Sequence, residues 1–426
     1  MVGQAIEPCS VLTNTQTPGR TPPLASRNHH REKQSMGGEA VLPDDLIEQI
    51  LLRFPPDDPT RLLRAALVCK HWCRLVSDAG FRRRSLEAHG GTLPMLGFLC
   101  NITNHNNNEA FTTSFVPTSS SCPHRDRFVP TTLELWPHGR GWRALDSRHG
   151  RVLLHALPYG DIHNRMVVWD PIADEQVELP KMPQEPNLYY WGWNAAVLCA
   201  TGGNRGGCGN GVDCHRTPFI VVFVGTMPRS MFARVYSSEA GAWSEMTTSS
   251  LFAHDYCLMG KPISAQAENM LYFLSSGSMI LKYGVTTGKL SEIHLPDTAN
   301  PTNVVLTVSE DGGLGFAEVV GSRLYLSSRN AGPDQDVGWT QSRVIELNRL
   351  FSIGARSTTP KVLGFAADGV GVIFLRTKDG VFTVDLKTER FVKLEKFSVE
   401  SNINRIYTIV PHVSFYTPDF NRHVYR

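Results

Sequence analysis

A strand–turn–strand phrase recurs through most of this chain, and it is the feature that most constrains the fold. Each copy has a short run of Val, Leu, Ile, Phe or Tyr, a polar turn with Asp or Gly, and a second short apolar run. Copies occupy 150–180, 233–246, 279–296 and 381–394, and a weaker one surrounds Arg343. Repetition with several strands per period predicts a β-propeller, because each small sheet buries its faces only against its neighbours.

The number of blades depends on the two ends of the repeating region. The copies account for about five blades. Strands expected at 93–100 and 405–416 would complete a sixth blade if they paired, which would close the ring and remove the open sheet edges. We therefore expect six blades, with five or seven as alternatives. A β-sandwich also contains many short strands, but it does not explain the regular return of the same turn.

Composition supports a β-rich protein and excludes some classes of partner. The 36 Gly and 27 Pro among 426 residues indicate many turns and few long helices. Lys and Arg number 42 against 40 Asp and Glu, a net charge of +2 that favours neither nucleic acid nor an anionic membrane. Nine cysteines without a paired framework favour a reducing compartment. No signal peptide is visible, so a cytoplasmic or nuclear location is expected.

The N-terminal segments differ in their pattern of apolar residues from the β-rich part. Residues 1–38 lack apolar periodicity and predict a disordered tail, whereas 39–88 read as a small all-α module and 89–426 as a large all-β domain. The expected class is thus an α+β multidomain chain. Apolar spacing predicts one helix that ends before Pro55 and a second that carries Leu62 to Val76. Two such helices cannot enclose all their apolar surface, which already implies docking to a partner.

The helical module carries a recognisable pair of clusters. Leu42-Pro-Asp-Asp-Leu-Ile-Glu-Gln-Ile-Leu51, followed by Val68-Cys-Lys-His-Trp72, resembles the F-box family. The phrases Gly150-Arg-Val-Leu-Leu154 and Val168-Trp-Asp-Pro171 resemble a large set of grass F-box proteins. In that family the helices bind a Skp-type adaptor, which links them to a cullin scaffold and a ubiquitin-charged enzyme. By resemblance, the residues that form or support the docking surface are Leu42, Pro43, Leu46, Ile50, Leu51, Val68, Cys69 and Trp72.

The resemblance implies a non-catalytic receptor that holds a protein substrate on its β-domain for ubiquitination. No nucleophile or paired-carboxylate motif stands out, and no cofactor is expected. One rival function is a propeller enzyme or a carbohydrate- or ligand-binding propeller with a helical appendage, whose site would be assembled from loops of different blades. Another is an adaptor-bound F-box protein with a non-degradative role.

Two further groups of residues are candidates for a functional site. Tyr189, Tyr190 and Trp191 are weak candidates for substrate contact, whereas Trp193, just before an expected strand, is interpreted as structural. A second group, Cys208, Cys214 and His215, offers three zinc donors. Its spacing does not fit a zinc knuckle and its surroundings are rich in Gly, so we interpret it as a long loop and expect no metal site.

Overall fold

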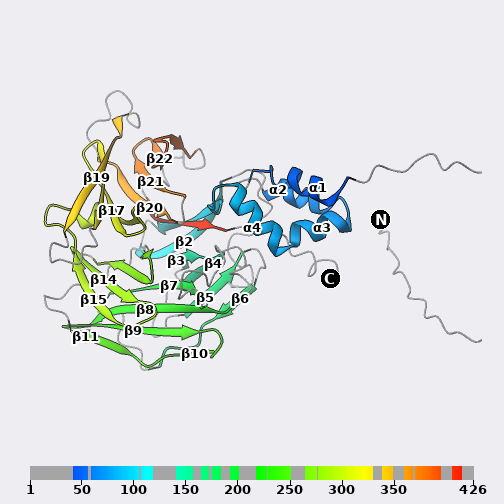
Figure 1. Cartoon of the computed structure of the whole chain (residues 1–426). Coiled ribbons are helices and arrows are strands. Elements are labelled where there is room, and N and C mark those ends of the chain that lie inside the picture. The colour runs from blue at the N-terminus through cyan, green and yellow to red at the C-terminus, as the bar shows by residue number, and fades with distance from the viewer. Residues whose placement is uncertain are drawn as a thin grey trace, which may run out of the picture. The chain divides into compact units, whose positions relative to one another are not determined.

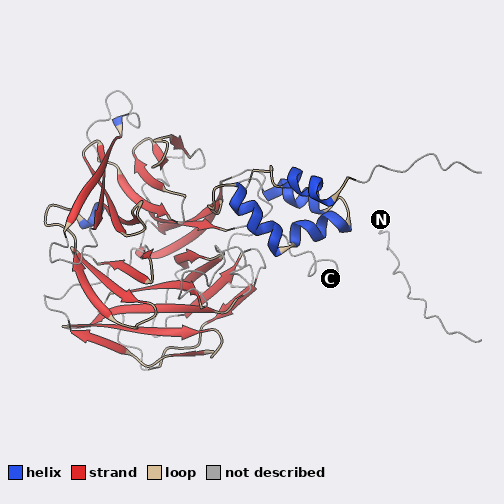
Figure 2. Cartoon of the chain, viewed as in Figure 1, coloured by secondary structure: helices blue, strands red, loops and turns tan. Residues whose placement is uncertain are grey.

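A computed structural model of the chain shows helices near the N-terminus and strands in the rest of the described part (Figures 1 and 2). The chain divides into two compact units, Met1–Pro43 and Asp44–Arg426, and the tail expected at 1–38 lies outside the described residues. No described helix is long and apolar enough to cross a bilayer. The structure describes residues 42–55, 59–104, 107–118, 141–156, 165–171, 175–183, 192–200, 217–227, 229–250, 264–275, 277–329, 338–348, 359–367, 370–394 and 405–414.

Four short helices form the helical module: α1 (Asp44–Leu51), α2 (Pro59–Ala66), α3 (Lys70–Ser77) and α4 (Ala79–Ala88). The first expected helix is confirmed, but the expectation of one continuous second helix is wrong. The backbone of Cys69 is extended, with φ −161° and ψ 164°, and its Sγ accepts a hydrogen bond from the Trp72 N–H at 3.5 Å. Cys69 therefore caps α3. Apolar spacing runs on through such a break, because the pattern does not report a local change of backbone conformation.

The described strands form six sheets in which every strand pair is antiparallel, and five of these sheets are built from strands that follow one another in the chain. In sheet order the first five are β3–β6, β7–β10 with β11 beside β9, β12–β15, β16–β19 and β20–β23. The sixth contains β2, β1 and β24. The strand bounds in the first two of these sheets are β3 Trp142–Arg148, β4 Arg151–Ala156, β5 Arg165–Asp170, β6 Glu175–Glu178, β7 Trp193–Cys199, β8 Phe219–Met227, β9 Ser230–Ser237, β10 Ala242–Trp243 and β11 Thr247–Ser250.

The remaining strands continue the same plan. A 3-10 turn, η3 (Pro301–Asn303), leads into the fourth sheet. The strand bounds are β12 Ser264–Ala267, β13 Met270–Leu274, β14 Met279–Gly284, β15 Leu290–His294, β16 Val304–Val308, β17 Leu314–Val320, β18 Arg323–Arg329, β19 Trp339–Glu346, β20 Lys361–Ala366, β21 Val372–Thr377, β22 Gly380–Asp385, β23 Phe391–Lys393, β1 Met95–Asn104, β2 Asn107–Pro117 and β24 Ile406–Val413.

The sixth sheet joins the two ends of the repeating region. β24, at the red end of the chain, pairs with β1, and the register places Leu99 opposite Val410 (Figure 1). β24 also contacts β20 on one side and β3 on the other. The pairing expected between the segments at 93–100 and 405–416 is therefore confirmed, and the fold is a six-bladed β-propeller that follows a small helical module.

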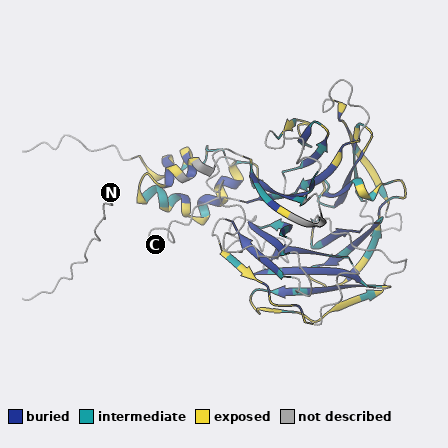
Figure 3. Ribbon diagram, turned by 180° about the vertical axis from the view of Figure 1, so that it is seen from behind, coloured by how far each residue is buried: buried dark blue, intermediate teal, exposed yellow. Residues whose placement is uncertain are grey.

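Six apolar clusters hold the propeller together, one between each pair of neighbouring blades. The cluster between the sixth and first blades contains Leu99 and Val410 from one side and Trp142 and Val152 from the other. The other five clusters join the successive blades in the same way. In Figure 3 the buried colour fills the sheets, while exposed positions collect on outer strands and turns. Each blade thus depends on its neighbours for burial, as the repeat predicted.

The recurring turn has a common backbone geometry in three blades. The N–H of Gly241 donates to Ser237 O at 2.9 Å, and the N–H of Gly288 donates to Gly284 O at 2.8 Å. Both glycines have positive φ, 62° and 66°. Glu389 occupies the same place with φ 54°. The left-handed conformation favours Gly, which explains why the sequence phrase so often ends its polar turn with that residue.

A buried amide supports the closing blade. Asn101, fully buried on β1, donates from Nδ2 to Ala144 O and to Thr408 Oγ1, both at 2.9 Å. Its Oδ1 accepts from the Thr113 hydroxyl at 2.8 Å and from the Ala144 N–H at 2.9 Å. The amide thereby links all three strands of the closing blade to β3 of the first blade, with each of its hydrogen-bonding groups satisfied.

Candidate functional site

The helical module has its own small core, to which all four helices contribute. Ile47 and Leu51 of α1 pack with Val76 of α3 and Phe81 of α4, together with the buried residues of α2. Asp78 ends α3 and caps α4, because its carboxylate accepts from the Phe81 N–H at 2.8 Å. The core uses only one side of α1, which leaves other apolar residues of that helix outside it.

Polar contacts also hold α1 to the later helices. The His71 Nε2 lies 2.8 Å from the Asp44 carboxylate, so the first residue of α1 meets the start of α3. Glu48 accepts from Arg84 of α4, a contact that raises the pKa of that guanidinium. Both pairs are solvent-exposed and are worth a few tenths of a kcal/mol to about 1 kcal/mol each. They orient α1 on the module more than they stabilise it.

Exposed apolar side chains are concentrated on the helical module. Among the described residues, ten large hydrophobic side chains are exposed, and five of them lie between positions 42 and 68. Leu46 and Ile50 are 45% and 43% exposed, and their spacing of four residues places them on one face of α1. Leu67 and Val68 are 67% and 64% exposed at the break between α2 and α3. We call these four side chains the apolar docking patch.

The part of the apolar docking patch at Leu67 and Val68 has basic neighbours along the chain, whereas the acidic Asp45 adjoins its α1 part. Arg64, Lys70 and Arg74 are exposed, and each lies within a few residues of Leu67 or Val68 along the chain. Lys70 and Arg74, four residues apart, share one face of α3. The chain around Leu67 and Val68 therefore combines exposed apolar side chains with positive charge.

The structure separates the sequence-predicted docking residues into two groups. Leu42, Pro43, Leu46, Ile50, Val68 and Cys69 are exposed. Leu51 is 1% exposed and belongs to the module core, and Trp72 is half-buried against that core. Leu67 was not among the predicted residues, because a continuous helix gave no reason to single it out. The lack of a good capping residue before Lys70 hides the break from sequence reasoning.

The other predicted positions fall mainly outside the described residues. Tyr189, Tyr190 and Trp191 lie there, as do Cys208, Cys214 and His215. Trp193 is described, and its ring stacks on Phe223 with centroids 4.9 Å apart. Its structural interpretation is confirmed. Within the described ranges no three His, Cys, Asp or Glu side chains gather in a way that could hold a metal ion.

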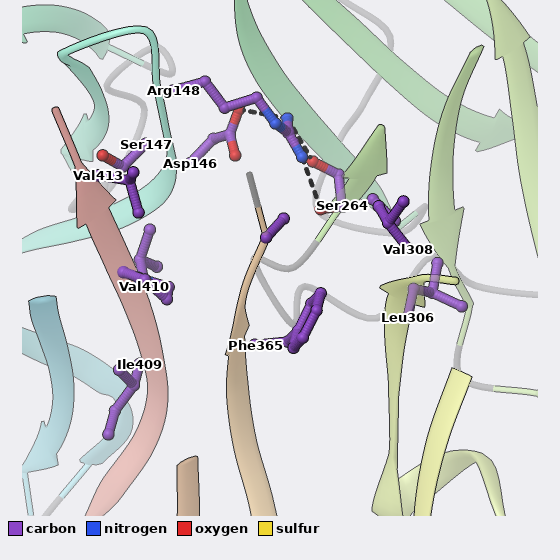
Figure 4. Close-up of a pocket in the computed structure, with 13 residues that line it drawn as sticks. Asp146, Ser147, Arg148, Ser264, Leu306, Val308, Phe365, Ile409, Val410 and Val413 are labelled. Atoms are coloured by element: carbon purple, nitrogen blue, oxygen red, sulfur yellow. Dashed lines mark hydrogen bonds and ion pairs between the residues drawn. The ribbon is translucent and has the colours of Figure 1, made fainter. Parts of the chain in front are cut away.

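A pocket lies on the propeller where the innermost strands meet (Figure 4). Its volume is about 50 Å³, and its lining comes from β3, β12, β16, β20 and β24, including the residues just beyond β20. These are five of the six innermost strands, so the pocket lies on the propeller axis. We call it the axial pocket. Sequence reasoning missed it, since its lining residues are spread from Asp146 to Val413.

One corner of the axial pocket is polar. Arg148 donates from Nη1 to the Asp146 carboxylate at 2.7 Å and to Ser264 Oγ at 2.9 Å, and from Nη2 to Ser264 O at 2.6 Å. The Asp146 carboxylate also accepts from the Val197 N–H at 2.9 Å. Three blades are joined at this corner, and both charged side chains are about nine-tenths buried. The ion pair is thus held in one geometry by blades on either side.

Elsewhere, burial is the main cause of pKa shifts in two groups that belong neither to the apolar docking patch nor to the axial pocket. It lowers the pKa of Arg143, on β3, to about 10, against a smaller opposing effect of Tyr407. It raises the pKa of the Cys100 thiol, on β1, well above its ordinary range. Both shifts follow from the cost of placing a charge in a low-dielectric interior.

Comparison with solved structures returns matches at low similarity. A chain of the "Crystal Structure of Mitotic Checkpoint Complex" is 10% identical, with 59% of this chain and 62% of that chain covered and a TM-score of 0.32. This chain therefore spans less than two thirds of that one. "YCF48 bound to D1 peptide" gives 11% identity, 72% and 84% coverage and a TM-score of 0.38. None of the curated proteins matched the chain.

Family comparison is decisive. The F-box domain model matches residues 41–84, a segment that contains α1, α2, α3 and the start of α4. The model described as "F-box protein AT5G49610-like, beta-propeller" matches residues 143–420, well over half of the chain. The first match covers the apolar docking patch, and the second covers the five consecutive blades and the strand that closes the ring. This chain belongs to the family of F-box proteins that carry an AT5G49610-like β-propeller.

Proposed function

We propose that this chain is the substrate-recognition subunit of a Skp–cullin–F-box ubiquitin ligase. In this proposal the F-box helices bind a Skp-type adaptor, and residues 89–426 hold a protein substrate. The observation that carries it is the apolar docking patch, because half of the large exposed hydrophobic side chains in the described residues fall within the F-box segment. Exposed apolar groups gathered on one small module mark a surface that is buried in a complex.

The exposure of the docking residues supports distinct roles for them. Leu46, Ile50, Leu67 and Val68 would contact the adaptor directly, and Cys69 would lie at the edge of that contact while it caps α3. Leu42 and Pro43, exposed immediately before α1, would extend the contact. Leu51 and Trp72 would support the contact indirectly, because their packing in the core of the module holds the helices that carry the exposed residues.

The charge around the patch adds to the chemistry of the partner. Arg64, Lys70 and Arg74 would meet acidic side chains at the rim of the adaptor surface, around an apolar centre. Charges at an interface rim mainly raise the rate of association and make it sensitive to salt. The favoured partner is therefore an apolar surface with acidic side chains where it meets Arg64, Lys70 and Arg74.

The chain itself makes and breaks no bond in this proposal. Its contribution is to raise the local concentration of a substrate lysine beside the ubiquitin-charged enzyme that is linked through the cullin scaffold. The proposal needs no cofactor and places the protein in the cytoplasm, the nucleus or both.

A pull-down tests the proposal. Leu46→Asp with Ile50→Asp puts two charges on the exposed face of α1, and the full chain should then fail to retain the purified Skp-type adaptor and cullin. The matched control is Val344→Asp with Val392→Asp, which makes the same change on β19 and β23, where both valines are exposed. The control should bind like the wild type. Equal adaptor binding by both pairs would remove the basis of the proposal.

A further inference from the structure

We infer that the axial pocket anchors one uncharged, apolar side chain of the substrate protein, with a nearby backbone carbonyl accepting from Arg148. The inference rests on the proposed function, since it names the substrate chemistry that the propeller would recognise. It concerns a different surface from the apolar docking patch, so the two can fail separately.

The walls of the pocket give its preference for an apolar group. Leu306 and Val308 of β16 face the pocket, with Phe365 of β20 and Val410 and Val413 of β24 (Figure 4). Val308 and Phe365 are only half-buried, so the apolar lining is not sealed from solvent. A carbon-rich wall left partly open gains free energy when an apolar side chain displaces its water.

The polar corner determines which charge the pocket can accept. Arg148 and Asp146 already neutralise each other across 2.7 Å, so the corner carries no net charge. A phosphate or carboxylate entering here would approach the Asp146 carboxylate, and a cation would approach the Arg148 guanidinium. Both would lose hydration without a free opposite charge to replace it. The electrostatics therefore disfavour a charged anchor of either sign.

Arg148 still has hydrogen-bonding capacity for a neutral acceptor. A guanidinium has five N–H donors. Within the described residues three are engaged, two from Nη1 and one from Nη2, by Asp146 and Ser264. Nε–H and the second Nη2–H remain for a carbonyl oxygen. Because three blades fix the side chain, little entropy is lost when such a group binds.

The size of the pocket restricts what it can hold. The pocket has a volume of about 50 Å³, and on the same scale one water molecule requires about 10–15 Å³. The pocket therefore has room for a few waters or for one side chain of about the size of leucine. A nucleotide or a sugar chain would extend far beyond it. We assign it to one residue of a protein segment that lies across the end of the propeller axis.

Selection from a random peptide library displayed on phage tests the inference with the full chain. Peptides enriched on the wild type should share an apolar residue at one position. Replacing that residue with Ala, Asp or Lys should weaken binding, by roughly 10- to 100-fold for Ala. Val308→Trp, which fills the pocket, should abolish binding. The control Val344→Trp makes the same substitution on the outer strand of the same blade and should have no effect.

A second variant covers the case in which Val308→Trp unfolds the chain, as its thermal melt would show. Val308→Ala enlarges the pocket and should shift the selected anchor from leucine-sized to phenylalanine-sized residues. Peptides that bind the wild type and Val308→Trp equally, or a consensus charged anchor, would overturn the inference. So would the absence of any peptide that prefers the wild type over Val308→Trp.

The same protein preparations separate this inference from the proposed function. Skp-type adaptor binding is measured on each variant, and it should be unchanged by Val308→Trp, since that residue lies outside the F-box helices. Pocket-dependent peptides without adaptor binding would contradict the ligase role and leave the axial pocket assigned. Adaptor binding without pocket-dependent peptides would contradict the inference about the axial pocket and leave the ligase role supported.

Discussion

Removing the two most exposed side chains of the apolar docking patch gives a quantitative test of its role. Leu67→Ala with Val68→Ala deletes five carbon groups, worth about 4 kcal/mol if all were transferred from water to a packed interface at about 0.8 kcal/mol each. The side chains are 67% and 64% exposed, so about two thirds of that is available to a partner. The expected loss is about 2.5 kcal/mol, or roughly a 60-fold increase in the Kd for the adaptor.

Isothermal titration of the adaptor into the full chain measures this difference. The remaining third of the burial, about 1 kcal/mol, is the largest expected loss of folding stability, so the variant should stay folded. Val344→Ala with Val392→Ala removes exposed apolar carbons from the propeller and should leave the Kd unchanged. A Kd within a factor of two of the wild type for the Leu67 and Val68 double variant would refute the reasoning.

Four more outcomes follow from the structure. Asn101→Ala should destabilise the chain by about 3 kcal/mol, measured by denaturant unfolding, because it leaves buried partners on three strands unsatisfied. Lys70→Glu with Arg74→Glu should slow adaptor association several-fold and weaken its salt dependence in stopped-flow measurements. Iodoacetamide should label the exposed Cys69 in the native chain but not the buried Cys100, as peptide mass spectrometry would show. Because burial raises the pKa of Cys100, the folded chain keeps a proton that the unfolded chain loses, so stability should fall above about pH 8.5, the ordinary thiol pKa.

Three of these four outcomes have a matched control variant. Thr248→Ala, at an exposed position of β11, should leave stability within about 0.5 kcal/mol of the wild type. Charge reversal at Lys361, exposed on β20, should leave adaptor association unchanged. Cys100→Ala should show a shallower loss of stability with rising pH than the wild type. A stable Asn101→Ala, an unaltered association rate, or rapid Cys100 labelling would contradict the respective arguments.

The propeller could be predicted from sequence because its information is local and repeated. The turn from Ser237 to Gly241 recurs with the same backbone geometry from Gly284 to Gly288. Its last residue has a left-handed conformation that favours Gly, so the turn can be recognised in the sequence. The closing blade was also predictable, since two unpaired strand patterns at opposite ends need partners. These features depend on neighbours in the chain or on a simple pairing rule.

The helical module and the axial pocket show where that reasoning stops. Apolar spacing predicted one helix through Cys69, whereas the backbone there is extended and Leu67 becomes the most exposed large hydrophobic residue of the described part. Leu51 and Ile50 are adjacent and equally apolar, yet one is 1% and the other 43% exposed. The pairing of Arg148 with Ser264 joins positions 116 residues apart, which no local pattern reports.

The most direct test of the central claim is assembly in solution. The full chain is mixed with a purified Skp-type adaptor and a cullin scaffold, and the mixture is resolved by size-exclusion chromatography with light scattering. The account predicts one peak whose mass equals the sum of one copy of each component, and loss of that peak with Leu46→Asp and Ile50→Asp. Separate elution of this chain from the adaptor, with the chain folded and monomeric, would contradict the account.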